Sequence, residues 1–490
     1  MISGLVAQRL RETPDHLFIR EMGGESYTVA TLRADVDRIA EGLKRTFENC
    51  DRLVIGVAMR SSYHWVATMF AIMEVRAVLL PVPIEFSDDQ IGSLLNKAAA
   101  VFVGDTVTAN RIEHILPGTL CLTADSPVGP PQDTANRERI EPGILAIIHT
   151  SGTTSKPKGV KIRDEAVKIL VDHVLERLPH RPLNYLSIVP MSLLIEQVLG
   201  IFLPLTTNGS LTLMPKGVPE YGAQSGNAAR YLDLVKAVHP DFLYLPPKLL
   251  EEADAKLDKT GVVEVFGLPA PHIITGGAKV PIAILESLDR KGLPIYEAYG
   301  LSENSSIISL NGPDCRRVGS AGPLLNGIEP RFVDGELLVR TPTLCAGYYN
   351  ADDTACDLSD GYLHTGDIAE IRDGFLFITG RKKHVIILST ARNISPEWVE
   401  TIYKDSPLID DMIVVGEGQP EPAAVVLSTA SEAAVRAEME SRHAKLADFA
   451  RVTRIHVEPD IADFRERYYT VTGRPRRSLI ADAFADRLYA

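Results

Sequence analysis

A loop rich in hydroxyl groups and lysines is the part of this 490-residue sequence that most directly suggests chemistry. It reads Thr150-Ser-Gly-Thr-Thr-Ser-Lys-Pro-Lys-Gly-Val160 and follows an apolar segment that ends at His149. Hydroxyl and backbone N–H groups on such a loop can surround phosphate oxygens, and the lysines add positive charge. It is not a Walker loop, because no Gly-Lys-Ser/Thr follows at the required spacing. The buried strand predicted before it and the basic residues between positions 156 and 163 favour a phosphate site over a solvated surface loop.

Two later segments each place a carboxylate in a short segment that contains glycine. Glu303 lies in Tyr299-Gly-Leu-Ser-Glu303, and Asp367 lies in His364-Thr-Gly-Asp367. An ionised carboxylate only accepts hydrogen bonds, and it can take two hydroxyl donors at once. Each segment alone is also typical of an ordinary turn, so the order of the segments along the chain decides the interpretation.

That order resembles the adenylate-forming superfamily, which contains acyl- and aryl-CoA synthetases, fatty acyl-AMP ligases, nonribosomal adenylation domains and luciferases. The resembling segments cover nearly the whole chain. The resemblance implies that the protein binds ATP and Mg²⁺. It also implies that the loop holds the β- and γ-phosphates through Thr150, Ser151, Gly152, Thr153, Thr154 and Lys158.

The resemblance also gives roles to the residues around the adenine and the α-phosphate. Tyr299 is expected to stack near adenine beside Gly300, Ser302 to contact the α-phosphate, and Glu303 to bind Mg²⁺. A second backbone segment is expected to line the acyl and adenine pockets, where missing side chains allow close approach. That segment consists of Gly276, Gly277 and Ala278.

The ribose contacts of the family lie just before the predicted domain boundary. Asp367 matches the carboxylate that holds both ribose hydroxyls, and Arg381, in Thr379-Gly-Arg381, matches the arginine that contacts ribose and phosphate. Lys383 falls at the hinge position of the family. We therefore expect a large N-terminal domain over residues 1–381 and a small mobile C-terminal domain over residues 382–490.

The sequence departs from the family pattern where the substrate and the α-phosphate would lie. The C-terminal loop has Arg474 where most of the family has lysine, and its basic residues are Arg474, Arg476 and Arg477. Arginine keeps the charge but is planar, bulkier and more weakly hydrated, and a solvated basic face is the alternative interpretation. Leu193 stands where relatives with a Pro-Leu-Ser-His segment have histidine. Glu196 is either a buried structural residue or a pocket residue with a raised pKa. With Gly276, these two residues are the candidates for substrate binding.

The elements that must position these residues alternate between helix and strand. Apolar runs at 53–58, 78–83, 144–149, 241–245 and 272–275 are typical of buried strands, and the segments at 27–43 and 65–75 have helical periodicity. Such strand–helix–strand units predict mostly parallel sheets covered by helices. After about position 316, short strands with turn signals predict a small antiparallel or barrel-like part. At the start of the C-terminal domain, Ser395 is the expected N-cap of a helix with Pro396 in its first turn.

Composition limits the remaining function classes. The formal net charge of −13 argues against a nucleic-acid binder, although basic residues gather at positions 156–163 and 474–477. The apolar stretch from 183 to 215 is broken by Pro190 and Pro204, so we expect a buried helix and a buried strand there instead of a membrane span. Five widely spaced cysteines suggest neither a disulfide framework nor a zinc site, and no signal peptide is evident. A cytoplasmic enzyme is expected.

The favoured hypothesis is an ATP- and Mg²⁺-dependent ligase that adenylates a carboxylic acid, releases pyrophosphate and passes the acyl group to CoA, a carrier-protein thiol or an amine. Its catalytic residues would be Lys158, Ser302, Glu303 and Arg474. Because the usual lysine and the pocket histidine are both missing, one alternative is a diazotase, which adenylates the oxyanion nitrite and transfers the nitrosyl group to an arylamine. A second alternative is a degenerate nucleotide-binding pseudoenzyme that sequesters an acyl ligand.

Overall fold

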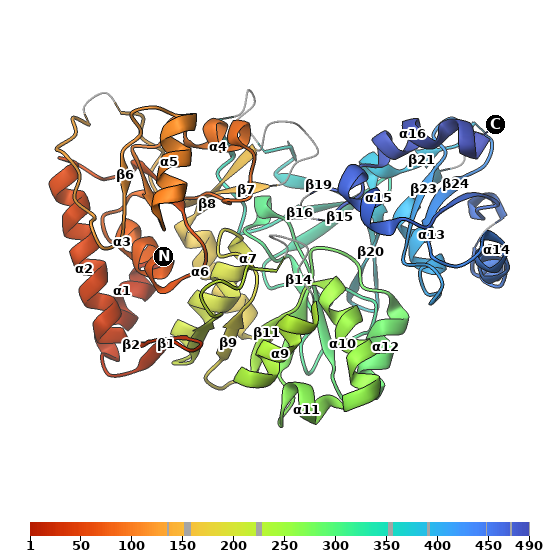
Figure 1. Cartoon of the computed structure of the whole chain (residues 1–490), viewed down its shortest axis with the longest axis horizontal. Coiled ribbons are helices and arrows are strands. Elements are labelled where there is room, and N and C mark those ends of the chain that lie inside the picture. Colours follow the sequence, from red (N-terminus) through yellow and green to blue (C-terminus); the bar gives the residue numbers. More distant parts are fainter. Residues whose placement is uncertain are drawn as a thin grey trace.

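The computed structural model describes residues 1–134, 137–150, 158–221, 228–350, 356–389, 393–446, 448–470 and 473–489. Along the chain it forms two large, mostly parallel sheets, then a smaller antiparallel sheet and a C-terminal α/β unit (Figure 1). This arrangement confirms the expected α/β fold, with a composite N-terminal part and a small C-terminal part.

The first large sheet has seven strands in the order β17-β8-β7-β4-β3-β5-β6. Strands β3 to β7 pair in parallel, and β8 and β17 add an antiparallel edge. The strands are β3 (Val54–Ala58), β4 (Val78–Pro81), β5 (Ala100–Val103), β6 (Cys121–Leu122), β7 (Ile144–Thr150), β8 (Lys158–Arg163) and β17 (Tyr348–Tyr349). All five residues of β3 are buried, which is why its sequence is continuously apolar instead of alternating.

The second large sheet has eight strands in the order β14-β13-β12-β11-β9-β10-β1-β2. Its inner strands are parallel, and β2 and β14 are antiparallel edges. The strands are β1 (Leu17–Glu21), β2 (Ser26–Thr28), β9 (Asn184–Ser187), β10 (Ser210–Leu213), β11 (Phe242–Tyr244), β12 (His272–Thr275), β13 (Ile295–Tyr299) and β14 (Ser309–Leu310). The carboxyl ends of its parallel strands therefore meet at one edge, which is where open α/β sheets bind ligands.

Helices pack on both faces of the two large sheets. Successive strand residues point to opposite faces, and the two faces belong to different cores: Ile274 packs in the core shared by both sheets, and Ile273 packs in the core on the other side. The shared core contains α1 (Ile2–Glu12), α2 (Val29–Thr46), α3 (Tyr63–Glu74) and α6 (Asp164–Leu175). The outer cores contain α4 (Asp88–Leu95) and α5 (Thr106–Ile115) on one side, and α9 (Ala228–Val238), α10 (Pro247–Thr260), α11 (Val262–Phe266) and α12 (Ile282–Arg290) on the other.

The apolar stretch from 183 to 215 differs from the expected helix followed by a strand. It begins with a buried strand, β9, which the sequence did not separate from the helix after it. The helix consists of α7 (Leu194–Glu196), the π-helical turn η1 (Gln197–Phe202) and α8 (Leu203–Thr206), and β10 follows. Periodicity cannot distinguish these short pieces, because nearly every side chain in them is buried. Among the described residues, no helix is long and apolar enough to cross a membrane.

The third sheet is antiparallel, as expected, and leads to the C-terminal unit. It contains β15 (Glu329–Val333), β16 (Glu336–Arg340), β18 (Leu358–Ser359), β19 (Tyr362–Arg372) and β20 (Phe375–Arg381). After β20 come the 3₁₀ turn η3 (Lys382–His384), the short pair β21 (Ile386–Ile387) and β22 (Asn393–Ile394), and helix α13 (Pro396–Tyr403).

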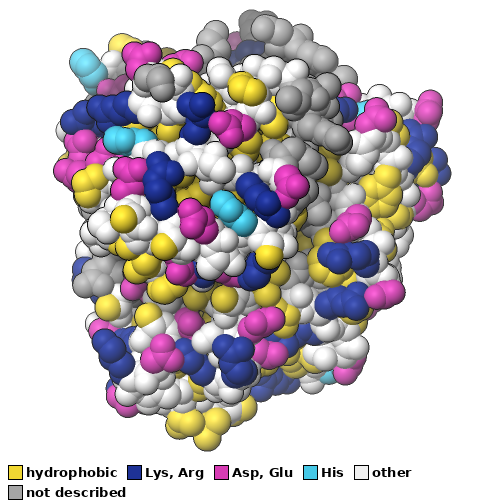
Figure 2. Space-filling view, turned by 90° about the vertical axis from the view of Figure 1, so that its right-hand side faces the viewer, with side chains coloured by type: hydrophobic (Ala, Val, Ile, Leu, Met, Phe, Trp, Pro, Cys, Tyr) yellow, Lys and Arg dark blue, Asp and Glu magenta, His cyan; other side chains and the backbone are white. Residues whose placement is uncertain are grey.

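The C-terminal unit has two cores of its own, formed by residues between 386 and 488. They flank the sheet of β23 (Asp411–Val415), β24 (Ala423–Leu427) and β25 (Arg454–Glu458), together with α14 (Glu432–Glu440), α15 (Ile461–Tyr468) and α16 (Arg477–Tyr489). The unit lies at one end of the long axis of the molecule (Figure 1). On the face that carries it, acidic and basic side chains are interspersed (Figure 2).

The prediction that Ser395 is the N-cap of a helix is only partly confirmed. Helix α13 does begin at Pro396 with Ser395 before it, but the Ser395 side chain makes no capping hydrogen bond. Instead, Ser395 Oγ donates a hydrogen bond of 2.5 Å to the carbonyl oxygen of Thr379 in β20. A Cβ at Gly380 would overlap Ser395 Oγ, so the glycine admits this contact. The serine thus ties the C-terminal unit to the third sheet.

Candidate active site

The ends of three neighbouring strands form the floor of the site. Tyr244 is the last residue of β11, Gly276 follows β12, and Tyr299 is the last residue of β13. The Tyr244 hydroxyl donates a hydrogen bond of 2.9 Å to the carbonyl oxygen of Gly276. A Cβ at Gly276 would lie 2.8 Å from the carbonyl oxygen of Ala298, so the backbone here approaches its neighbour as closely as the sequence predicted. Gly277 has a left-handed φ of 81°, and Ala278 is exposed, so the chain turns sharply along the site.

Asp367 is the most strongly held carboxylate of the site. The Tyr299 hydroxyl donates to its Oδ2 over 2.5 Å, and Nε of Arg381 lies 2.6 Å from its Oδ1. Asp367 and Arg381 are direct partners in the pairing of β19 with β20, which places both side chains on one face. Burial raises the pKa of Asp367, while the Arg381 charge and the Tyr299 hydrogen bond lower it. Burial and the neighbouring carboxylate raise the pKa of Tyr299.

A second carboxylate, Glu336, fixes the turn that carries Asp367. The backbone N–H of Gly366, which has a left-handed φ of 68°, donates to Oε1 of Glu336 over 3.1 Å. The other oxygen of Glu336 lies 2.7 Å from Nζ of Lys382 and 3.2 Å from the ring of His364. The side chain of Glu336 is 3% exposed, and the sequence did not predict its role. Its only sequence signal was a charged residue at the start of the apolar strand β16.

Glu303 lies in the 3₁₀ turn η2 (Ser302–Asn304), directly after the Tyr299–Gly300 segment. A Cβ at Gly300 would overlap the backbone of Ser306, so only glycine lets the chain fold back at this point. The Tyr348 hydroxyl, from β17, donates to Oε1 of Glu303 over 3.0 Å. No described residue donates to Oε2 of Glu303, so this hard oxygen remains for a cation. Tyr348 was not predicted from the sequence either, because it reaches Glu303 from a strand 45 residues further along the chain.

The phosphate loop is flanked by two paired strands. Thr150 and Lys158 are partners in the antiparallel pairing of β7 with β8, so these strands form the base of the loop. Its expected phosphate ligands Ser151, Gly152, Thr153 and Thr154 lie outside the described residues. One nearby lysine does not serve the expected basic cluster: Nζ of Lys161 forms an ion pair of 2.6 Å with Glu141.

The C-terminal loop carries Arg474. Desolvation and the charge of Arg381 lower the pKa of Arg474, while Asp367 and Tyr244 raise it, so its charge acts on side chains from the strands β11, β19 and β20. The loop is closed by a bridge between Tyr469 and Pro475. Arg474 is itself an exposed residue, so a solvated basic face remains the alternative interpretation for it.

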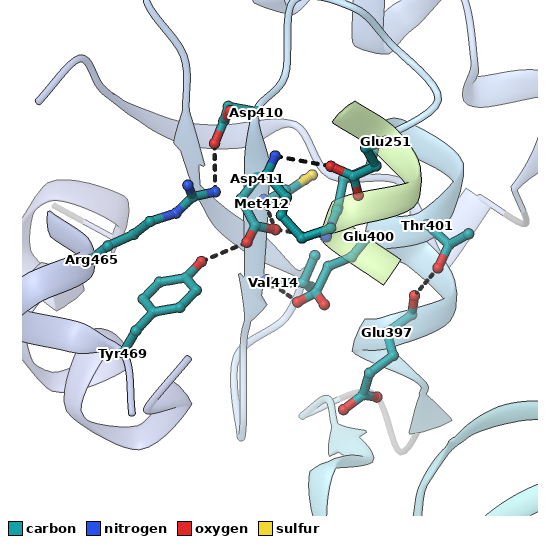
Figure 3. Close-up of polar contacts among 12 residues, drawn as sticks. Glu251, Glu397, Glu400, Thr401, Asp410, Asp411, Met412, Val414, Arg465 and Tyr469 are labelled. Atoms are coloured by element: carbon teal, nitrogen blue, oxygen red, sulfur yellow. Dashed lines mark hydrogen bonds and ion pairs between the residues drawn. The ribbon is translucent and has the colours of Figure 1, made fainter. Parts of the chain in front are cut away.

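Arg477, in contrast, does not belong to a solvated basic face. Its guanidinium is paired with Glu400 and donates to the carbonyl oxygen of Val414 over 2.6 Å. Figure 3 shows the polar cluster around Glu400, where the Tyr469 hydroxyl donates to Asp411 over 2.7 Å. The side chain of Glu251, from α10, faces this cluster (Figure 3). Burial lowers the pKa of Lys404, whereas the charge of the nearby Asp411 and, to a smaller extent, that of Glu251 raise it. Arg477 thus stabilises the C-terminal unit and is not available to a phosphate.

The candidate substrate residues have different environments. Glu196 is fully buried, and its Oε2 accepts a hydrogen bond of 2.6 Å from the Tyr185 hydroxyl. Its Oε1 is buried without a hydrogen-bond partner among the described residues. Burial raises the pKa of Glu196 to about 8. Glu196 is therefore a buried residue, as the first interpretation held, and it also has the raised pKa of the second. Its charge also raises the pKa of Tyr244, which places it behind the floor of the site. Leu193 is 41% exposed.

The structure therefore gathers residues that are far apart in the sequence. Tyr299, Asp367, Arg381 and Arg474 form one group, and Gly276 and Glu196 are linked to it through Tyr244. Glu303 and Ser302 lie on the turn that begins beside Tyr299.

Comparison with known proteins identifies the family. Residues 6–349 match the model of the AMP-binding enzyme family, and residues 383–481 match that of the AMP-binding enzyme C-terminal domain. A long-chain-fatty-acid–CoA ligase of Mycobacterium bovis is 25% identical over 493 aligned positions, covering 87% of this chain and 81% of that protein.

Two solved structures share the fold. The anthranilate CoA ligase AuaEII, in complex with anthranoyl-AMP, superposes with a TM-score of 0.83 at 17% identity, covering 98% of this chain and 96% of that one. The o-succinylbenzoate CoA synthetase of Bacillus subtilis, in complex with ATP and magnesium ion, gives a TM-score of 0.77 at 20% identity, covering 92% and 95%. Because the family model spans well over half of the sequence, the chain belongs to the AMP-binding enzyme family and is an AMP-forming ligase.

Proposed function

We propose that this protein activates a carboxylic acid with ATP, forming an acyl-AMP and pyrophosphate, and then transfers the acyl group to CoA. The observation that carries the proposal is the buried Asp367, held between Tyr299 and Arg381 at the strand ends. A carboxylate in this position offers acceptors for two ribose hydroxyls, and Arg381 offsets its charge. The similarity to a fatty-acid–CoA ligase supports an acid substrate and CoA as acceptor.

The residues present fit ATP and magnesium. Oε2 of Glu303 is a hard oxygen that suits magnesium, and Oε1 of the same carboxylate already accepts a hydrogen bond from Tyr348. The strands β7 and β8 flank the proposed phosphate loop. Magnesium, when bound, neutralises charge on the triphosphate. Ser302 precedes Glu303 and is proposed to donate to the α-phosphate, while Thr150, Lys158 and the loop between them are proposed to hold the β- and γ-phosphates.

Arg474 is proposed to stabilise the α-phosphate while the substrate carboxylate attacks it. Its charge already acts on Asp367, so it lies near the proposed ribose site. A guanidinium provides several N–H donors in one plane, which suits the oxygens of a phosphoryl group that gains charge in the transition state. The missing lysine is therefore compensated within the same loop.

The acyl group is proposed to lie against Gly276, Leu193 and the buried Tyr185–Glu196 pair. At neutral pH a carboxyl group with a pKa near 8 is mostly protonated, so Glu196 adds no negative charge that would repel an acid substrate. Its Oε1, which has no hydrogen-bond partner among the described residues, is then proposed to hydrogen-bond to a polar group of the substrate.

The two parts of the chain are proposed to act as the domains 1–381 and 382–490, with a hinge at Lys383. The separate cores on either side of this position support that division. Rotation about the hinge would withdraw Arg474 after adenylation and admit the second nucleophile.

The test is AMP formation from ATP and Mg²⁺ with a panel of fatty, aryl and short-chain acids, followed by addition of CoA. We expect acid-dependent pyrophosphate release for at least one class and a thioester product. ATP binding without AMP formation across the whole panel would contradict the proposal and favour the pseudoenzyme alternative. The diazotase alternative is not supported by the comparisons.

A further inference from the structure

Two of the five cysteines, Cys345 and Cys356, lie side by side next to the proposed metal-binding turn. Their sulfur atoms are 2.8 Å apart, although eleven positions separate the residues in the sequence. Both are free thiols in this structure. A disulfide has a bond length of about 2.05 Å, so a movement of under 1 Å separates this pair from bonding distance. The spacing of the cysteines gave no sign of this contact.

The pair is connected to Glu303 through short contacts. The backbone N–H of Cys345 donates to the carbonyl oxygen of Glu303 over 2.8 Å. Three residues after Cys345, the Tyr348 hydroxyl donates to the Glu303 side chain. A bond between Cys345 and Cys356 would close a covalent ring that contains Tyr348. A change at the two sulfurs is therefore transmitted directly to both contacts that hold Glu303.

The two thiols differ in exposure. Cys345 is 2% exposed, whereas Cys356 is half-buried and can be reached by a small reagent. The other cysteines lie elsewhere: Cys50 is buried, Cys121 lies in β6, and Cys315 accepts a hydrogen bond of 3.0 Å from Arg177.

We propose that Cys345 and Cys356 are a redox-modification site, forming a reversible disulfide with a low-molecular-weight disulfide such as oxidised glutathione. The Cys356 sulfur, after losing its proton, attacks one sulfur of glutathione disulfide and releases one glutathione. The Cys345 sulfur, also deprotonated, then attacks the Cys356 sulfur of the mixed disulfide and releases the second glutathione. The two cysteines lose two electrons and two protons, and glutathione disulfide is reduced to two thiols.

The consequence rests on the proposed function, in which Glu303 binds the metal. Closing the bond draws the Cys345 segment toward Cys356 and shifts the two contacts that orient Glu303. Residues that orient a metal ligand affect metal affinity strongly, so the oxidised protein is expected to require about 10-fold more Mg²⁺ for half-maximal nucleotide binding.

The first experiment detects the bond itself and needs no activity. Fully reduced protein is equilibrated at a series of ratios of reduced to oxidised glutathione, trapped with N-ethylmaleimide and analysed by mass spectrometry. We expect two maleimide adducts fewer per chain and a cross-linked peptide that joins Cys345 to Cys356. Cys356→Ser and Cys345→Ala should abolish the cross-link, and Cys121→Ser should retain it. Independent alkylation of both thiols at every oxidising ratio would overturn the proposal.

The second experiment measures the link to Glu303. The Mg²⁺ dependence of ATP binding is compared by calorimetry for the reduced protein, the oxidised protein and both forms of the Cys121→Ser control. An oxidised protein with an unchanged Mg²⁺ requirement would overturn the link. If the protein binds Mg²⁺ and ATP but forms no acyl-AMP, the proposed function fails while both redox results still decide this inference.

Discussion

Two buried carboxyl groups near the site have opposite surroundings, and this difference sets what each can do. Burial raises the pKa of Asp367, but Asp367 touches the positive charge of Arg381, which offsets part of that effect. Glu196 has only the neutral Tyr185 hydroxyl as a hydrogen-bond partner at Oε2, and its Oε1 has none among the described residues. A buried charge without an ion partner is costly, so the Glu196 proton is retained to higher pH.

Replacing Glu196 should therefore change the pH dependence of stability. Its folded pKa of about 8 lies above the ordinary glutamate pKa of 4.5, so between these pH values the native state holds a proton that the unfolded state has lost. Stability is then lost as pH rises from about 4.5 through 8, by on the order of 3–5 kcal/mol for this group. Glu196→Gln keeps an acceptor for Tyr185 and should gain at least about 2 °C in Tm relative to wild type between pH 5.5 and pH 8.5.

The control for that measurement is Glu286→Gln, which alters an exposed residue of α12. Its Tm difference from wild type should not vary with pH. A constant difference for Glu196→Gln as well would show that Glu196 is ionised throughout the range.

Replacing Asp367 should weaken the use of ATP. Asp367→Asn retains the size of the side chain but loses one acceptor and leaves Arg381 without its charge partner. We expect kcat/KM for ATP to fall about 10- to 100-fold, the loss associated with a charged hydrogen bond. The matched control is Asp373→Asn, at an exposed aspartate in the turn between the same two strands. Equal kinetics of the two variants would exclude Asp367 from nucleotide binding.

At the scale of elements, the hairpin that carries Glu303 depends on one glycine. The Cβ of Gly300→Ala would overlap the Ser306 backbone, which cannot move away as a flexible side chain would. We expect a lower Tm and at least about a 10-fold loss of adenylation, because the turn after Tyr299 must shift. Gly4→Ala, in the exposed face of α1 where nothing lies near the new methyl group, should leave both unchanged or slightly raise the Tm. Thermal melting and AMP formation distinguish the outcomes.

The sequence predicted several of the elements, because apolar runs and helical periods are local properties. It predicted β3, β4, β7, β11 and β12 and helices α2 and α3 close to their observed bounds. It missed β9, since a short buried strand beside a buried helix has no distinguishing pattern. It also gave Ser395 the wrong hydrogen bond, because the acceptor, Thr379, lies on another element.

The same limit applies to the site. Tyr299, Asp367, Arg381 and Arg474 were predicted from ordered motifs, and the structure brings them together. Tyr348, Glu336 and Tyr244 were not predicted, because each acts by reaching a residue more than 25 positions away. Arg477 was assigned to a basic cluster, whereas its buried partner Glu400 is 77 positions distant. Tertiary contacts of this kind leave no local pattern.

At the scale of the whole molecule, Arg474 is a residue of the C-terminal unit that is proposed to act at the nucleotide site. Arg474→Ala should reduce AMP formation at least about 10-fold, because it removes the positive charge that is proposed to stabilise the negative charge developing on the α-phosphate. Transfer from chemically supplied acyl-AMP to CoA should be much less affected, because that step no longer involves the triphosphate. Arg467→Ala, at an exposed arginine of α15 in the same unit, is the control and should affect neither step. Equal loss in both half-reactions would indicate a folding defect instead.

Asp367 and Arg381 face each other across a strand pair, and the chain enters the C-terminal unit only two residues later. A rotation axis at the proposed hinge would pass close to the proposed ribose contacts and far from α14 and α16, the outer helices of the C-terminal unit. A large movement of these helices would then displace Asp367 and Arg381 very little. The proposed rotation would therefore change the residues around the α-phosphate while the ribose stays bound.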